Sequence, residues 1–136
     1  MFEVGVVVQF RATHRLDGDF GPARRRHGHN YRVIVTGKGP KLREDGTLCD
    51  ISMLDRVVQE AVGAMRFQDL NRMSAFQGRN STAEVVAEYL YGQIASQLQD
   101  NGLASLVIRV WESTKAYGSY EGTLSQHGEL LGVPSP

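Results

Sequence analysis

The sequence predicts an α+β domain whose elements follow one another in the order ββααββ. Four segments alternate apolar and polar side chains with the two-residue period of half-buried strands. Two segments between the second and the third of these strands repeat their apolar residues at the spacing of a helix. At 136 residues the chain is long enough to bury a core of its own, and we expect a single domain over residues 1–136.

The first two strands are expected over residues 2–14 and from residue 27 to about residue 37. In both strands the residues of one parity are largely apolar, and the same parity includes His14 in the first strand and His27 and His29 in the second. Residues 15–26 are polar and contain glycine, which predicts an elaborated connection between two long antiparallel strands.

The two helices are expected after a turn region. Residues 37–46 hold glycine, proline and mixed charge, and residues 47–51 are compatible with a short strand. Ser52-Met53-Leu54-Asp55 resembles a capping box, which predicts that the first helix begins there. Its apolar stripe consists of Leu54, Val57, Val58, Ala61, Val62 and Met65. After a loop over residues 67–80, a second capping box, Ser81-Thr82-Ala83-Glu84, opens a helix that is expected to stop at residues 100–102.

The last two strands are expected around residues 106–112 and over residues 117–124. Glu112 continues the parity of Leu106, Ile108 and Val110, and an ionised carboxylate on an apolar face is costly unless a partner satisfies it. Two interpretations stay open. Either the strand has ended and Glu112 is solvated, or Glu112 accepts hydrogen bonds from a ligand that presents two N–H donors together, such as the guanidine-like edge of a heterocycle.

Composition narrows the class of partner. Lys plus Arg and Asp plus Glu number 15 each, so the net charge gives no argument for a nucleic acid or an anionic membrane, and a small-molecule partner is expected. The single Cys49 cannot form an intramolecular disulfide, and we interpret it as a small buried residue. The sequence has neither a signal-peptide pattern nor an apolar run long enough to span a bilayer, which predicts a cytoplasmic protein.

Three of the four histidines are spaced as a catalytic zinc site requires. Side chains two residues apart on a strand point the same way, so His27 and His29 share a face, and Gly28 between them allows close backbone approach. His14 lies on the apolar face of the neighbouring strand. Three imidazoles would leave one zinc position open. The alternative is that each histidine is a hydrogen-bonded core or turn residue.

Four segments in order resemble the 6-pyruvoyl-tetrahydropterin synthase and 6-carboxy-tetrahydropterin synthase family. They are His14, His27-Gly28-His29 with Tyr31, Asn80-Ser81-Thr82-Ala83-Glu84, and Val110-Trp111-Glu112-Ser113, and together they cover most of the chain. The resemblance implies the tunnelling fold, a four-stranded antiparallel sheet with two helices on one face. It also implies trimers whose sheets join into a barrel, stacked into hexamers, with active sites between subunits.

The resemblance assigns roles to five residues. It implies that His14, His27 and His29 bind zinc, that Glu112 anchors the amino-pyrimidine ring of a pterin, and that Thr82 lines the same pocket. The zinc of the family binds the side-chain hydroxyls of dihydroneopterin triphosphate and lowers their pKa, and a nearby base then moves protons in a lyase reaction.

The chain departs from the family where the catalytic groups are expected. The catalytic Cys position, four residues before the first histidine of the triplet, is Ala23, and residues 20–26 contain no acid that could replace it. Aligning Leu70-Asn71 with the matching step of the family puts Arg66 and Phe67 where a catalytic Asp-His pair is expected. The chain is therefore predicted to be a divergent member that lacks the usual thiolate and Asp-His pair.

Two residues are candidates for the missing base. Asp69 is nearest in sequence to the missing pair, with an exposed loop acid as the alternative, and His127 in the C-terminal segment could reach the site of a neighbouring subunit. The run Arg24–Arg26 is interpreted as a solvated face, with a phosphate or carboxylate clamp joined by Arg66 as the alternative.

Three functions follow from these residues. The leading one is a zinc-dependent pterin lyase acting on dihydroneopterin triphosphate or a close relative. The second is a binding protein that keeps zinc and the pterin pocket without the chemistry, because loss of a general acid or base lowers a rate by about 10²- to 10⁴-fold. The third is an enzyme of altered specificity for another pterin or a purine-like ring. A purely structural zinc fits least, because structural sites fill the fourth position with a protein ligand.

Overall fold

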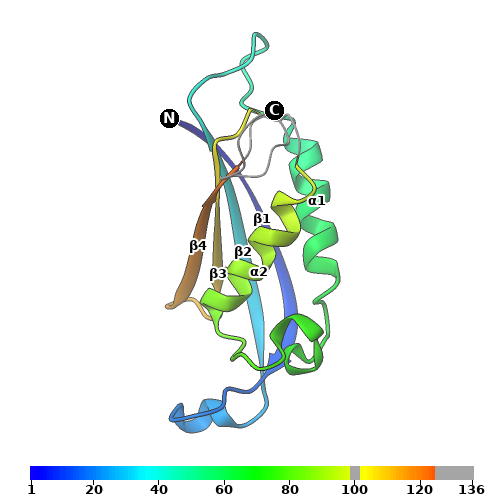
Figure 1. The fold of residues 1–136 in the computed structure, drawn as a ribbon, viewed down its shortest axis with the longest axis vertical. Coiled ribbons are helices and arrows are strands. Elements are labelled where there is room, and N and C mark those ends of the chain that lie inside the picture. The colour runs from blue at the N-terminus through cyan, green and yellow to red at the C-terminus, as the bar shows by residue number, and fades with distance from the viewer. Residues whose placement is uncertain (99–101, 125–136) are drawn as a thin grey trace, which may run out of the picture.

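A computed structural model describes residues 1–98 and 102–124, and Figure 1 shows one sheet with both helices on the same side of it. The strands are β1 (Phe2–His14), β2 (His27–Gly39), β3 (Ser105–Trp111) and β4 (Tyr117–Thr123), and the helices are α1 (Ile51–Gly63) and α2 (Ala83–Ala95). All neighbouring strands are antiparallel, in the order β1-β2-β3-β4. The predicted α+β class, the order ββααββ and the placement of two helices on one face are confirmed.

The β1–β2 hairpin positions the histidines. Its register runs from Phe2 opposite Gly39 to His14 opposite His27, so the two longest strands pair over their whole length. The connection over residues 15–26 contains a short 3₁₀ turn at Gly21–Arg24. β2 extends two residues beyond its predicted end near residue 37.

The core lies between the sheet and the helices. Five of the six residues in the predicted stripe of α1 are buried, and Ala61 is partly buried. The strands contribute their inward parity to the same core, including Phe10, Tyr31, Val33 and Ile108. Burial of this apolar face is the main reason why both helices lie on one side of the sheet.

The predicted helix starts need correction, and so does the short strand predicted over residues 47–51. Residues 47–50 form no strand, because Asp50 is already the N-cap of α1 and Ile51 is its first helical residue. The Asp50 carboxylate accepts hydrogen bonds from the backbone N–H groups of Ser52 (3.0 Å) and Met53 (3.3 Å).

The second helix also begins later than its capping box predicts. Its N-cap is Thr82, whose hydroxyl accepts a hydrogen bond from the Val85 N–H at 3.3 Å, so Ser81 lies outside the helix. α2 ends at Ala95, before the predicted stop, and of residues 100–102 only Gly102 lies in the described part of the chain.

The predicted loop over residues 67–80 contains two further 3₁₀ turns, Leu70–Arg72 and Ser74–Phe76. It runs beside the end of β1, where the Phe67 N–H donates to the Arg11 carbonyl (2.7 Å) and the Thr13 N–H donates to the Gln68 carbonyl (3.0 Å). These bonds bring Asp69 next to the histidine end of β1. Within residues 1–98 and 102–124 we find no helix with the length and apolar character needed to cross a membrane.

Candidate metal centre and ligand pocket

The three predicted histidines converge at one end of the sheet. The register places His14 opposite His27, and His29 opposite Ala12, so the three rings share the face that the helices cover. The ring centroids lie 4.6 Å (His14–His27), 5.0 Å (His14–His29) and 4.7 Å (His27–His29) apart. One nitrogen from each ring lies within 4.8 Å of the other two. The arrangement therefore has the three imidazole donors that a zinc ion accepts.

The outer ring nitrogens of this cluster are held by backbone carbonyls. His14 Nδ1 lies 2.8 Å from the Ser81 carbonyl and 3.1 Å from the Ser81 hydroxyl, and His27 Nδ1 lies 2.7 Å from the Arg25 carbonyl. His29 forms a hydrogen bond to the backbone of Glu112. A carbonyl can only accept, so Nδ1 of His14 and of His27 carries a proton, and in the neutral ring Nε2 is then the nitrogen with the lone pair. Metal-binding histidines in proteins are commonly oriented in this way.

One buried atom gives a direct test of whether the site fits a metal. His14 is 1% exposed, and its Nε2 has no hydrogen-bond partner within the described chain. An unpaired buried nitrogen is costly unless another group uses its lone pair. Nε2 of His14 is on the ring side left free by Ser81, and a metal held by the cluster would satisfy it. The donor set therefore fits zinc.

Burial favours the neutral form of His14 and His29. Burial is the largest cause that lowers the pKa of His14 to about 4; the neighbouring His27 and His29 lower it further, while the Ser81 hydrogen bond and Asp69 oppose the change. Burial, followed by the charge of His27, also lowers the pKa of His29, against the hydrogen bond to Glu112. Neutral imidazoles are the form that binds metal, so competition from protons at His14 and His29 is weak at neutral pH.

The lowered pKa of His14 predicts acid sensitivity of the metal-free protein. The unfolded chain takes up a proton near pH 6.5 and the folded chain only near pH 4, so stability is lost as the pH falls through this window. The difference corresponds to on the order of 3 kcal/mol of unfolding free energy. Urea unfolding followed by circular dichroism from pH 7 to pH 4 measures it. His14→Asn should flatten the curve, and an unchanged slope in that variant would contradict the assignment.

A small cavity joins the other two predicted ligand-binding residues. Thr82 at the start of α2 and Glu112 directly after β3 line a cavity of about 260 Å³, together with Leu16, Phe20 and Tyr117. Glu112 is half-buried, and within the described residues its carboxylate has no hydrogen bond or ion pair. Its acceptor oxygens are thus available to a ligand.

A second carboxylate lies in this cavity, and it was not predicted from the sequence. Glu84 lines it beside Thr82, and Gly118 leaves room for it, because a Cβ at Gly118 would lie 2.9 Å from the Glu84 side chain and 2.7 Å from its backbone nitrogen. Burial is the main cause that raises the pKa of Glu112, the Glu84 charge adds to it, and His27 opposes both. Glu84 was assigned to a capping box. With the cap at Thr82, the Glu84 side chain has no hydrogen bond or ion pair among the described residues.

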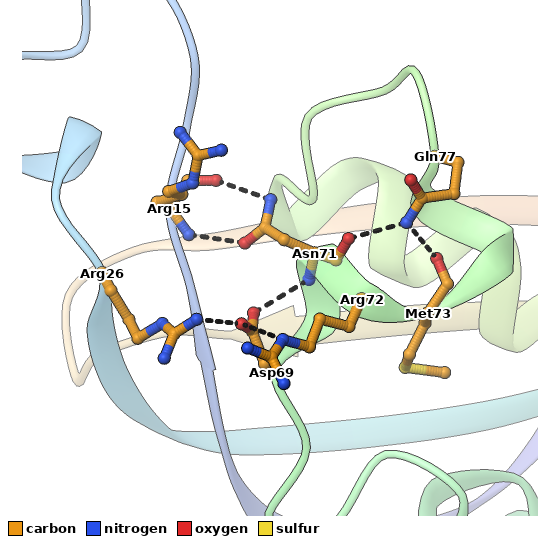
Figure 2. A network of polar contacts seen from close by, with 7 residues as sticks. All are labelled: Arg15, Arg26, Asp69, Asn71, Arg72, Met73 and Gln77. Atoms are coloured by element: carbon orange, nitrogen blue, oxygen red, sulfur yellow. Dashed lines mark hydrogen bonds and ion pairs between the residues drawn. The ribbon is translucent and has the colours of Figure 1, made fainter.

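Asp69 lies beside the cluster, but its carboxylate already has partners (Figure 2). It is ion-paired with Arg26 and Arg72, and it accepts a hydrogen bond from the Asn71 N–H at 3.1 Å. Its side chain is 14% exposed, so it is not the exposed loop acid of the alternative interpretation. The Asn71 side chain in turn accepts a hydrogen bond from the Arg15 N–H and donates one to the Arg15 carbonyl. These two bonds hold the loop against the end of β1.

The arginines of the run Arg24–Arg26 differ in their contacts. Arg26 contacts Asp69, whereas Arg24 and Arg25 have no ion pair in the described structure. Arg66 donates to the Gln9 carbonyl at 2.9 Å and does not join the run. Phe67, the other residue at the position of the missing pair, is 81% exposed and has a left-handed φ of 58°.

Cys49, His127 and Tyr31 are the remaining residues of interest. Cys49 is buried as predicted, and burial, assisted by Asp50 and opposed by Arg43, raises the pKa of its thiol. His127 lies outside the described residues. Tyr31 was not predicted as a site residue, yet its buried hydroxyl has no hydrogen-bond partner in the described structure, and its ring lies 5.3 Å from that of His29.

The chain is similar in sequence to tetrahydropterin synthases. A family model described as 6-pyruvoyl tetrahydropterin synthase matches residues 3–123. A 6-pyruvoyl tetrahydrobiopterin synthase of Drosophila melanogaster is 29% identical over 104 residues, which is 75% of this chain but only 61% of that protein. A putative 6-carboxy-5,6,7,8-tetrahydropterin synthase of Pyrococcus abyssi is 26% identical over 143 residues, covering 88% of this chain and 90% of that protein.

Solved structures share the fold. The 6-pyruvoyl tetrahydropterin synthase of Caenorhabditis elegans superposes with a TM-score of 0.78 at 24% identity, over 89% of this chain and 95% of that one. The enzyme of the same name from Plasmodium vivax superposes with a TM-score of 0.74 at 14% identity, over 91% and 100%. These likenesses confirm the predicted tunnelling fold.

Proposed function

The chain belongs to the 6-pyruvoyl tetrahydropterin synthase family, and we propose that it is a zinc-dependent pterin lyase acting on dihydroneopterin triphosphate or a related pterin. One observation carries the proposal. Three imidazoles converge, His14 Nε2 is buried without a hydrogen-bond partner among the described residues, and His27 acts electrostatically on Glu112, which lines a cavity. A metal site and a ring-binding acid are thus neighbours, as a reaction on a pterin side chain requires.

His14, His27 and His29 would hold the metal. Zinc held there would supply Lewis acidity, which favours ionisation of a substrate hydroxyl. The chain's own contribution is to orient the three imidazoles through the backbone of Ser81, Arg25 and Glu112.

Glu112 and Thr82 would bind the ring. An amino-pyrimidine edge presents two neighbouring N–H donors, and a carboxylate accepts both. The negative charge of Glu84 is, next to burial, the second cause that raises the pKa of Glu112. A ligand that donates two N–H groups to Glu112 would offset this repulsion. Thr82 lines the same cavity from the N-terminus of α2.

Asp69 and His127 stay our candidates for the proton-transfer group. Asp69 acts electrostatically on His14, although Arg26 and Arg72 engage its carboxylate. Asp69→Asn keeps an oxygen that can accept from Asn71 and removes the base. If Asp69 is the base, turnover falls by about 10²- to 10⁴-fold with zinc content unchanged. His127→Ala is the parallel variant. Unchanged turnover in either variant removes that residue from the mechanism.

The function itself is tested by product analysis. Zinc-loaded protein, metal-stripped protein and His27→Ala are each incubated with dihydroneopterin triphosphate, and the products are identified by mass spectrometry. The expected result is a new product that only the zinc-loaded wild type forms, and its mass identifies the reaction. A product that forms equally without metal would contradict zinc dependence.

A second candidate function is a family member that binds zinc and a pterin without lyase chemistry. The observation that favours it is chemical: Ala23 offers no thiol, Arg66 is occupied by the Gln9 carbonyl, and Phe67 has no titratable group. Ring binding without any product in the mass-spectrometric assay would support this candidate. Turnover of a different pterin or a purine-like ring would support altered specificity.

A homo-oligomer, trimeric or hexameric, and a cytoplasmic location are part of the proposal. Strands β1 and β4 lie at the two edges of the sheet, where backbone groups can pair with another strand. The exposed Phe67 is a further apolar contact that a second copy would cover.

A further inference from the structure

Two hydrogen bonds run from the histidine cluster to the walls of the cavity of about 260 Å³. We call this cavity the ring cavity, because the proposed ring-binding residues Thr82 and Glu112 line it. One bond joins His14 Nδ1 to the Ser81 carbonyl at 2.8 Å, and the other joins His29 to the backbone of Glu112. Two of the three metal-binding candidates are therefore each connected to a different wall of the ring cavity.

The first wall is the start of α2. Ser81 is 0% exposed, and its carbonyl belongs to the peptide bond that joins it to Thr82. The Thr82 hydroxyl accepts a hydrogen bond from the Val85 N–H at 3.3 Å and fixes the first turn of the helix, from which Thr82 and Glu84 line the ring cavity. The Ser81 hydroxyl also lies 3.1 Å from His14 Nδ1, so Ser81 contacts this imidazole through two atoms. The orientation of the imidazole and the position of this wall are thus linked.

The second wall is the turn that follows β3. The Glu112 N–H donates to the Ala116 carbonyl at 3.2 Å, and both residues line the ring cavity. The hydrogen bond between His29 and the Glu112 backbone therefore acts on the residue that closes this turn. His27 differs from the other two histidines, because it bonds the Arg25 carbonyl and Arg25 does not line the ring cavity.

The ring cavity and the histidine cluster share these two walls and no lining side chain. None of the described residues that line the ring cavity is a histidine, so a ring bound there touches the walls and not the imidazoles. In the metal-free protein His14 Nε2 is buried without a hydrogen-bond partner among the described residues. A metal held by the cluster would fix the imidazoles, and with them the two walls. A binding surface that is ordered in advance binds its ligand at a lower entropic cost.

We propose that Ser81 is a positioning residue that couples the metal centre to the ring cavity, so that metal binding strengthens ring binding and ring binding strengthens metal binding. The hydrogen bond between His29 and the Glu112 backbone is a parallel path. Coupling between two sites is reciprocal, and it typically changes an affinity by about 5- to 150-fold. This coupling rests on the proposed function, which names zinc and a pterin ring as the two ligands, and it adds that the ring needs the metal without touching it.

Calorimetry with 5-deazapterin tests the coupling without turnover. This ring keeps the amino-pyrimidine edge, but it lacks the ring nitrogen with which a pterin chelates a metal. We expect the zinc-loaded protein to bind it at least about 5-fold more tightly than the metal-stripped protein, whose fold is checked by circular dichroism. Equal affinity of the two forms overturns the coupling and leaves the proposed function in place. If neither form binds 5-deazapterin, the proposed ring binding is wrong and the coupling is wrong with it.

Ser81→Ala tests the path of the coupling. The ratio of the zinc-loaded to the metal-stripped affinity is expected to fall by about 2-fold or more, because the contact of the hydroxyl with His14 is lost. The Ser81 carbonyl remains, so the variant still binds zinc. Ser52→Ala is the matched control, because Ser52 is an exposed serine in the first turn of α1, and its ratio should equal that of the wild type. A merely structural role of Ser81 would weaken both forms alike, and an unchanged ratio in Ser81→Ala overturns the proposal.

Discussion

Glu112→Gln is expected to weaken binding of an unreactive oxidised pterin by about 10²-fold or more, with the fold intact. Each hydrogen bond to a charged group contributes about 1.5–3 kcal/mol, and the carboxylate is proposed to accept two from the ring. The amide keeps one acceptor oxygen and turns an N–H₂ group towards the second ring donor. Isothermal titration calorimetry of the zinc-loaded protein measures the change.

Stability should move in the opposite direction from affinity. Burial and the Glu84 charge raise the pKa of Glu112, against His27, so a neutral side chain removes an unfavourable charge from the pocket. Thermal unfolding of Glu112→Gln is thus expected at the same or a higher temperature than the wild type. Glu60→Gln is the matched control, since Glu60 is exposed on α1 and should leave both affinity and stability unchanged. Pterin affinity that survives in Glu112→Gln would place the ring elsewhere.

The alternation of residues along the strands was enough to predict the histidine cluster and Glu112. Two-residue alternation and a hairpin connection suffice to bring His14 opposite His27, because a strand leaves only two directions for a side chain. The same alternation led to Glu112, which follows β3 directly. The resemblance to a known family then connected these residues to a pterin.

Contacts between distant segments were not predictable in this way. Ser81 holds His14 although the two are 67 residues apart, and no local pattern links them. The capping box at residues 81–84 predicted Ser81 as the N-cap, whereas the N-cap is Thr82. Because Ser81 and Glu84 were assigned to the cap, neither the contact of Ser81 with His14 nor the place of Glu84 in the cavity was predicted. At α1 the carboxylate of Asp50 caps the helix before Ser52 is reached, so the predicted strand over residues 47–51 does not form.

His27→Ala is expected to abolish retention of zinc, while the wild type keeps one ion per chain after dialysis. The variant leaves two imidazoles, and the loss of a direct ligand should exceed the ~10- to 100-fold that the loss of an orienting partner costs. Elemental analysis of the dialysed protein measures the metal. His27 is only partly buried, so its removal should leave the core packing and the circular dichroism spectrum unchanged.

Ser81→Ala is the comparison variant for His27→Ala, because Ser81 orients a metal ligand and is not itself one. It removes the hydroxyl 3.1 Å from His14 Nδ1 but keeps the Ser81 carbonyl at 2.8 Å, so the ring stays oriented and zinc affinity should fall by much less than in His27→Ala. If the histidines were only hydrogen-bonded core residues, the wild type would retain no zinc and the two variants would not differ in metal content. The unpaired Nε2 of His14 argues against that outcome, because a core histidine with no metal to bind would leave this buried nitrogen unsatisfied.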